Sequence, residues 1–382
     1  MRALRSTQTL LASLALLAIV ALIGSGTSPG TQQNFITALV SATIVYGLYV
    51  FIGNSGVISF GHISFTAIGA FTAGVLTIPV GPKHLVLPGL WSFLAQHSVS
   101  GFVSLVIAAA LGGVFAVIVG IPLMRLSGIA AGIATFAILQ ITYTLYQQWT
   151  KIGPGPLTLS LVPTSVGIWQ AFLGAIFAAI VAFGYQRSRR GRLLRASRED
   201  PAAAQAIGVN ITRERLVAFG VSGMLAGLGG GLLVHQLGSI TVDQVYLELT
   251  FLTLAMLVIG GSGSLWGATI GALAISLLDS WLAAAENTVH VFSLFTVTLP
   301  NGASDLILGV IMAAMLLFRP QGLTGGSEFS LGFLKGRSVF GFRPAALAVG
   351  KPEPEADPSP PDAIAPGGDT TAPHHVEPVE PH

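Results

Sequence analysis

The sequence contains no cysteine and few charged residues. The absence of cysteine excludes disulfide bonds, thiolate metal sites and cysteine nucleophiles. Only 9% of the 382 residues are charged, compared with about 25% in soluble domains. The chain also lacks a Gly-x-x-x-x-Gly-Lys-Ser/Thr loop and a His-Glu-x-x-His motif. It therefore carries neither the phosphate-binding loop of an ATPase nor the signature of a zinc hydrolase.

Apolar residues are abundant and gather in long runs. They make up 52% of the chain, and the runs are close to the length of about 20 residues that crosses a bilayer. This pattern predicts an all-α polytopic membrane protein with about ten transmembrane helices. The predicted spans are 9–25, 34–52, 63–80, 101–121, 126–146, 167–185, 216–236, 246–261, 265–283 and 304–318.

The positive charges fall on one side of this arrangement. If the N terminus lies in the cytoplasm, 16 of the 18 lysines and arginines are cytoplasmic. Only Lys83 and Lys151 fall on the other side. Because cytoplasmic loops of membrane proteins carry an excess of Lys and Arg, we expect a multi-pass protein with both termini in the cytoplasm.

Residues 1–30 have two interpretations. Arg2 and Arg5 precede an apolar run that ends in small residues, a pattern that a signal peptide also has. The sequence Ser-Pro-Gly at 28–30 is more typical of a loop than of a cleavage site. We therefore expect a first transmembrane span, or a signal-like segment that stays uncleaved.

The C-terminal segment 344–382 differs from the rest in composition. It is rich in proline, contains seven acidic residues and one lysine, and has no long apolar run. Such a composition cannot bury enough apolar surface to fold, so we predict a disordered cytoplasmic tail. His374, His375 and His382 could bind a metal, but the composition favours a solvated terminus, and we predict no metal site.

The segment 186–215, between the sixth and seventh spans, holds eight of the fourteen arginines. Within it Asp200 is a favourable N-cap, Pro201 suits the first helical position, and Gly208 can end a helix in the left-handed conformation. The sequence therefore predicts a short helix with a small, apolar exposed face that suits docking to a partner. A linker helix without a partner is the alternative that these local signals leave open.

This segment resembles the coupling loop of ABC importer permeases, in which two adjacent alanines are followed after three residues by a glycine. The matching residues are Ala203, Ala204 and Gly208. The glutamate that usually precedes the alanines is Ala202, and no Leu-Pro follows. These departures are typical of permeases for branched-chain amino acids of the LivM type. Three further stretches resemble that branch: 56–71, 195–219 and 260–273.

The resemblance covers roughly residues 30–320 and implies a permease domain at 31–320 with a cytoplasmic coupling loop at 186–215. It implies the membrane subunit of an ATP-driven importer in a bacterial inner membrane. The implied partners are a second, LivH-type permease, two ABC ATPases that bind ATP and Mg, and an extracytoplasmic substrate-binding protein. The chain itself would bind no cofactor and no nucleic acid, and would have no catalytic residue. The implied coupling residues are Asp200, Pro201, Ala203, Ala204, Ile207 and Gly208.

A glycine-rich stretch at 53–74 joins the second and third spans. Irregular backbone at membrane depth is tolerated where it lines a cavity or is buried in protein, and transporters often place a site at such a break. The polar candidates for the translocation path are Asn54, Ser55, Gly56, Ser59, His62 and Ser64. His62 could relay protons, but a histidine hydrogen-bonded at a helix start is the favoured interpretation, because the stretch contains no acid.

Ten spans divide into two halves of five, and an odd number gives the halves opposite orientations. The connection between the second and third spans then corresponds to that between the seventh and eighth. One contains Gly-Val-Ile-Ser at 56–59 and the other Gly-Ser-Ile-Thr at 238–241. The match predicts two inverted five-helix halves and adds Ile240 and Thr241 to the candidate path.

Three alternative functions stay open on the sequence alone. A permease for urea or short amides would resemble the same branch. An ion-gradient-driven secondary transporter or channel would hold ionisable residues within its spans, and the candidates Glu248, Asp279 and Asp305 lie near span ends. An intramembrane enzyme would need paired acids, which we do not find.

Overall fold

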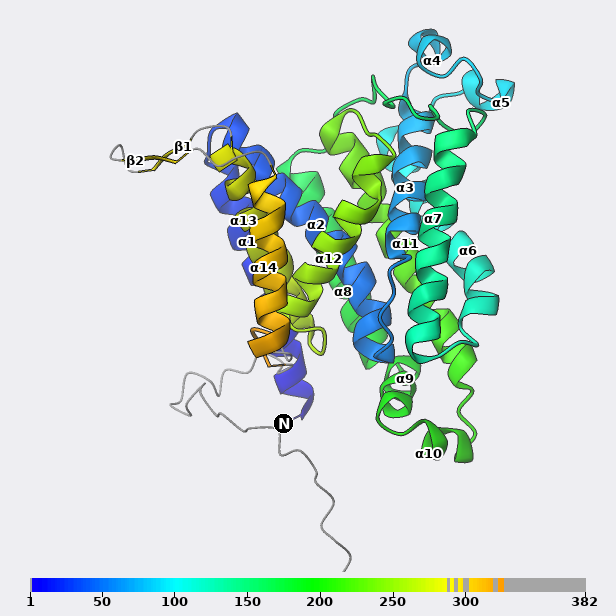
Figure 1. Cartoon of the computed structure of the whole chain (residues 1–382), viewed down its shortest axis with the longest axis vertical. Helices are drawn as coiled ribbons and strands as arrows, with labels where there is room; N and C mark the ends of the chain where they lie inside the picture. Colours follow the sequence, from blue (N-terminus) through cyan, green and yellow to red (C-terminus); the bar gives the residue numbers. More distant parts are fainter. Residues whose placement is uncertain (1, 287–288, 292–294, 298–301, 319–321, 326–382) are drawn as a thin grey trace, which may run out of the picture. The chain divides into compact units, whose positions relative to one another are not determined.

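The computed structural model describes residues 2–286, 289–291, 295–297, 302–318 and 322–325. Its architecture is almost entirely helical (Figure 1). The helices that correspond to the ten predicted spans are α1 (Arg2–Ser25), α2 (Pro29–Ser55), α3 (His62–Thr77), α6 (Gly101–Leu123), α7 (Gly128–Gln148), α8 (Ile168–Arg187), α11 (Ile211–Leu237), α12 (Leu247–Gly260), α13 (Leu265–Glu286) and α14 (Ala303–Phe318). Every predicted span therefore coincides with a helix.

The remaining elements are short and lie between these helices. They are α4 (Val80–Val86), α5 (Ser92–Ala95), α9 (Arg189–Glu199), α10 (Pro201–Ala206), η1 (Asp243–Val245), β1 (Val289–Val291) and β2 (Phe295–Val297). The two strands form an antiparallel hairpin in which Val289 pairs with Val297, an element that the apolar pattern did not predict. The tail predicted for 344–382 lies outside the described residues.

Eight of the described helices are long and apolar enough to cross a membrane by themselves. The apolar helix α3 is shorter, with 16 residues, or about 24 Å at 1.5 Å per residue. The chain is thus a polytopic helical membrane protein, as the composition predicted. Helix α1 packs on α8 and α2 and buries Leu17 and Ala21.

Helices α2 and α11 form the centre of the bundle. Helix α11 packs along α6, α3 and α2, and α2 packs along α11, α8 and α13. Residues 38–55 of α2 are all buried. The only sign of this burial in the sequence is that the segment is apolar along its whole length. A helix that is apolar on every side belongs in the interior of the protein, and α2 lies there.

Glycines let the central helices approach until their backbones touch. A Cβ added at Gly230 of α11 would lie 1.9 Å from the carbonyl oxygen of Thr66 in α3. Between α12 and α13, a Cβ added at Gly260 would lie 2.1 Å from the carbonyl oxygen of Gly267. Small residues are the usual means of close helix packing in membranes, so these contacts fix the helix spacing.

The two halves of the chain have the same local design with opposite direction. Helices α2 and α11 each contain 27 residues and end at a glycine in the left-handed conformation, Gly56 with φ 70° and Gly238 with φ 72°. Each is followed by a non-helical segment and a short helix, α3 or α12. Helix α11 packs on α3 and α6, and α2 packs on α12 and α13. The conformations therefore agree with the predicted inverted repeat.

The ends of the bundle differ in character. Figure 1 shows α9 and α10 at one end and α4 and α5 at the other. In the second group Lys83 is fully buried, and its Nζ donates to the carbonyl oxygens of Leu94 (3.0 Å) and His97 (2.7 Å). Burial lowers the pKa of this ammonium group. Lys83 thus fastens the loop after α3, although the sequence presented it only as a charge on the non-cytoplasmic side.

The close contact between α3 and α11 predicts that one added methyl group lowers the stability of the protein at Gly230 but not at an open position. Gly230→Ala should destabilise the protein by about 1–3 kcal/mol, because the methyl group overlaps the Thr66 carbonyl. Gly184→Ala in α8 is the matched control, since no atom lies within 4 Å of its added Cβ, and it should be neutral or stabilising. Melting temperatures in detergent would test this. Equal melting temperatures for the two variants would contradict the described packing.

Candidate functional site

The short helix predicted around residue 204 is present as α10. Asp200 is its N-cap, and its Oδ1 accepts a hydrogen bond from the backbone N–H of Ala203 at 3.0 Å. Pro201 occupies the first helical position, and Gly208 follows the helix with φ 85°. All three local signals were therefore interpreted correctly.

The exposed face of this helix differs from the predicted one at a single residue. Ala203 and Ile207 are exposed, Ile207 at 78% of its surface. Ala204 is only 4% exposed, and the prediction that it lies on the outer face is wrong. Helix α10 folds back on α9 and α11, and the helical period turns residue 204 toward them. Its carbonyl also accepts the N–H of Val209 at 3.0 Å.

Helix α9 connects this region with the end of α2. The Nη1 of Arg198 donates to the carbonyl oxygen of Gly53 at 3.3 Å. The same side chain lies over Gly56, where an added Cβ would be 2.8 Å from Arg198 Cδ. The turn between α12 and α13 contacts the same place, with the Ser262 carbonyl oxygen 2.8 Å from a Cβ added at Gly53. The end of α2 is therefore clamped between α9 and this turn.

The first helix break runs from Gly56 to Gly61. Figure 1 shows this segment rising from the lower end of α2 to the base of α3. At its upper end, His62 Nδ1 lies 2.8 Å from Ser59 Oγ. The imidazole is enclosed by aromatic rings, with centroids 5.3–5.7 Å away. These rings belong to Phe51, Phe65 and Phe219. A hydrogen-bonded histidine at the helix start is therefore what the structure has.

The predicted path residues of this break lie inside the chain. Of the six, only Gly56 is exposed. Three of the buried ones carry a side-chain atom without a hydrogen-bond partner, and these atoms are Asn54 Oδ1, His62 Nε2 and Ser64 Oγ. Leaving such groups buried and unpaired costs about 1–3 kcal/mol each. These unpaired atoms lie in the last turn of α2 and the first turn of α3, on either side of the break.

The second break follows α11 and enters from the opposite end. Ile240 is fully buried and pairs with Leu159 through two backbone hydrogen bonds of 2.8 and 2.9 Å. Thr241 is partly exposed, and its N–H donates to Gln244 Oε1 at 3.1 Å. The matched glycines Gly56 and Gly238 therefore lie at opposite ends of the bundle, and the chain re-enters after each.

Both breaks reach helix α7. Phe60, from the first break, meets Phe136 of α7 and Phe251 of α12 edge to face, with centroids 6.5 and 6.4 Å apart. Tyr246, after the second break, stacks on Tyr143 of α7 with centroids 4.0 Å apart. Two segments far apart in the sequence thus converge along one side of α7.

A polar network that the sequence analysis missed joins the second break to α7. The Tyr143 hydroxyl donates to Asp243 Oδ1 at 2.7 Å and accepts from Gln147 Nε2 at 3.1 Å. The Tyr246 hydroxyl donates to Gln140 Oε1. A signal was available, since Gln140, Tyr143 and Gln147 follow the helical spacing of three and four within an apolar span. Asp243 lies in the connection after α11, where the sequence gives no local sign of this contact.

With this geometry established, the chain can be compared with known proteins. Residues 31–316 match the family described as the branched-chain amino acid transport system permease component. The chain belongs to this family. The match covers nearly all of the membrane domain that the motifs at 56–71, 195–219 and 260–273 had indicated.

Individual relatives agree with the family. The high-affinity branched-chain amino acid permease protein LivM of Salmonella typhimurium is 29% identical over 75% of this permease and 69% of its own length. LivM of Escherichia coli is 28% identical over 78% of this chain and 70% of its own length. A LivH permease protein of Methanocaldococcus jannaschii is 32% identical over 36% of this chain and 42% of its own. No solved structure matches the chain.

The permease is therefore a transport protein, as the sequence predicted. The family supports this function over the alternatives of an ion-gradient-driven transporter and an intramembrane enzyme. Among the residues that the structure describes, no group of three or more His, Asp or Glu is close enough to hold a metal.

The Arg198 contact at Gly56 predicts a difference between two glycines of similar conformation. Both Gly56→Ala and Gly208→Ala place a side chain in the left-handed region, at a cost of about 1–2 kcal/mol. Only Gly56→Ala also pushes against Arg198, since no atom lies within 4 Å of a Cβ added at Gly208. Gly56→Ala should therefore lower the melting temperature of the purified permease more than Gly208→Ala.

The double variant tests the cause. In an Arg198→Ala background, the additional loss caused by Gly56→Ala should disappear, because the two residues are coupled only through their contact. An additional loss that persists without the Arg198 side chain would show that some other neighbour resists the methyl group.

Proposed function

We propose that this permease is a transmembrane subunit of an ATP-driven importer of branched-chain amino acids. The family match over residues 31–316 carries the proposal. The LivM relatives, whose names state the same transport system, support the substrate class. The chain contains no phosphate-binding loop, so ATP and Mg would be bound by separate ATPase subunits.

Three kinds of partner complete the proposed importer. A LivH-type permease would cover the side of this chain that lies open in the isolated subunit, and two ABC ATPases would bind at the end where α9 and α10 lie. An extracytoplasmic binding protein would deliver substrate at the opposite end. The excess of arginines around α9 and α10 supports a cytoplasmic location for that end, with both termini on the same side of a bacterial inner membrane.

The contact of α9 with α2 supports a mechanism of coupling. An ATPase that grips α10 would displace α9, because the two helices pack on each other. Arg198 would then move the end of α2 through Gly53 and Gly56. The first break begins at that point, so nucleotide-driven motion would reach the segment whose buried polar atoms lack partners.

Uptake by the reconstituted complex tests the proposed function. Proteoliposomes containing the permease with its partner subunits should accumulate leucine, isoleucine and valine when ATP and the binding protein are supplied. Ionophores that collapse ion gradients should leave uptake unchanged. Uptake that needs an ion gradient but no ATP would contradict the proposal, and uptake of urea in place of leucine would replace the substrate class.

The exposed face of α10 predicts where ATPase docking can be disrupted. Ala203→Glu would place an unpaired charge in a buried contact, which costs several kcal/mol. Since 1.4 kcal/mol is a factor of ten in an equilibrium, ATPase association should fall at least tenfold. Ala196→Glu in α9 is the control, because Ala196 is also exposed but lies outside the predicted docking helix. Co-purification of the ATPases with each variant measures the effect.

The buried position of Ala204 makes it unsuitable for this test, because Ala204→Glu would disturb the packing of α10 on its own chain. If Ala203→Glu retains its ATPases as well as Ala196→Glu does, α10 is a linker and not a docking helix. That result would also remove the main mechanical support for an ATP-driven importer.

A further inference from the structure

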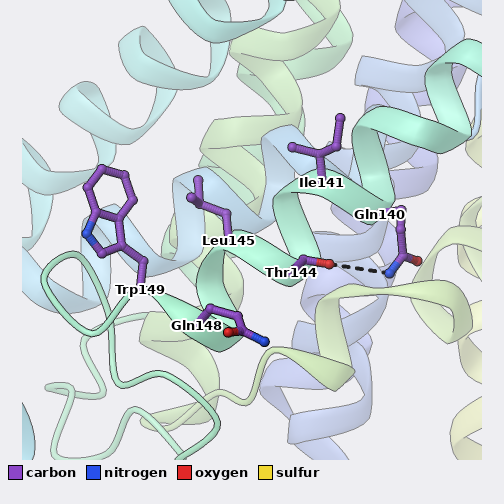
Figure 2. Close-up of a pocket in the computed structure, with 6 residues that line it drawn as sticks. All are labelled: Gln140, Ile141, Thr144, Leu145, Gln148 and Trp149. Atoms are coloured by element: carbon purple, nitrogen blue, oxygen red, sulfur yellow. Dashed lines mark hydrogen bonds between the residues drawn. The ribbon is translucent and has the colours of Figure 1, made fainter.

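Helix α7 carries an open groove on its outer side. The groove has a volume of about 540 Å³ and is lined by α7 alone. Figure 2 shows Gln140, Thr144 and Gln148 along one edge of the helix and Ile141, Leu145 and Trp149 along the other. The groove therefore has a row of hydrogen-bonding groups beside a row of apolar side chains.

The polar edge is continuous with the network at the second break. Gln140 Nε2 donates to Thr144 Oγ1 at 3.4 Å, and Gln140 Oε1 accepts the hydroxyl of Tyr246. Tyr246 stacks on Tyr143, whose hydroxyl donates to the exposed carboxylate of Asp243. The network thus ends at one negative charge that water or a ligand can reach.

These polar groups lie where lipid would be expected. Gln140 is eight residues from the end of α7, or about 12 Å along the helix. Gln140 and Thr144 are nevertheless exposed. A neutral polar group in an apolar medium costs free energy unless it is hydrogen-bonded. This side of α7 therefore faces a hydrated space or a partner in the working protein.

One turn of α7 before Gln140, aromatic side chains gather next to the groove. Phe136 and Phe251 are partly exposed, at 39% and 47%, and Phe60 lies against both. Phe60 belongs to the first break, which begins beside Arg198. Motion of that break would therefore move Phe60 against Phe136, one turn of α7 before the groove.

We propose that this face of α7 binds a zwitterionic amino acid with an apolar side chain during transport. The carboxylate of Asp243 would bind the ammonium group, and the amides and hydroxyls of Gln140, Thr144 and Gln148 would bind the carboxylate. The apolar side chain would pack on Ile141 and toward Phe136. This proposal rests on the proposed function, because it requires a second permease that closes the groove.

The charge pattern favours this ligand class. Asp243 supplies one negative charge, and the groove itself supplies only neutral hydrogen-bonding groups. A zwitterion has a positive group that can pair with the Asp243 carboxylate. Its negative group can accept hydrogen bonds from the neutral donors of the groove. An amide such as urea would leave the Asp243 charge without a counter-charge.

Thiol labelling tests the site directly, because the chain has no cysteine of its own. In the assembled importer, Thr144→Cys should react with a charged, water-soluble methanethiosulfonate reagent, since a thiol in lipid is not ionised. Leucine, supplied with the binding protein, should slow this reaction at least fivefold. Leu173→Cys in α8 is the control, because Leu173 is 63% exposed on an apolar surface, and it should not react.

Transport by two pairs of variants provides the second measurement. Asp243→Asn should lower leucine uptake at least tenfold at saturating binding protein, and Asp243→Glu should restore part of it. Tyr143→Phe should lower uptake, whereas Tyr185→Phe, which removes a hydroxyl without a hydrogen-bond partner in α8, should not. ATPase assembly should be normal in all four.

The outcomes separate this site from the proposed function. Failure of Thr144→Cys to react, or reaction that no amino acid slows, overturns the site, whatever the complex transports. Normal uptake by Asp243→Asn overturns it as well. A wild-type complex that imports no branched-chain amino acid, while another zwitterionic amino acid protects Thr144→Cys, overturns the proposed substrate but supports the site.

Discussion

The backbone contact between α3 and α11 is the constraint on which the rest of this structure depends. Helix α3 is too short to cross a bilayer alone, and the segment before it is not helical. In lipid such a segment would leave backbone groups unsatisfied, so it must be enclosed by protein. Gly230 permits α11 to touch the Thr66 carbonyl and so hold α3 in place. Helices α12 and α13 also touch through their backbones, at Gly260 and Gly267.

The two helix breaks, held between packed helices, offer a route by which motion at one end of the bundle can be transmitted to its centre. The first begins beneath Arg198 and ends among buried polar atoms that lack partners. The second begins at Gly238 and leads to the network around Tyr143. Because packed helices surround both breaks, we expect displacement to be concentrated in the two non-helical segments. The proposed coupling contact at Arg198 therefore lies at the end of one break, and the proposed ligand site lies beside the other.

Much of this could be predicted from the sequence because the signals are local. Apolar runs specify membrane helices without reference to other residues, and Asp200, Pro201 and Gly208 define α10 within nine positions. The burial of Ala204 could not be predicted, because it depends on how α10 folds back on α9 and α11. The contact of Arg198 with Gly53 and that of Tyr143 with Asp243 join residues 145 and 100 positions apart, and no periodicity records them.

For the predicted path residues, the sequence indicated the helix break correctly but did not show which way the polar side chains point. The stretch around Ser59 and His62 is a helix break, as its glycines indicated, yet both side chains are buried, and phenylalanine rings enclose His62. The exposed polar groups lie instead on α7, a helix that looked like an ordinary span. A break frees the backbone, whereas a stripe of glutamine and tyrosine on an intact helix offers side chains to a ligand. In the proposed mechanism, the element that moves and the element that binds are therefore separate.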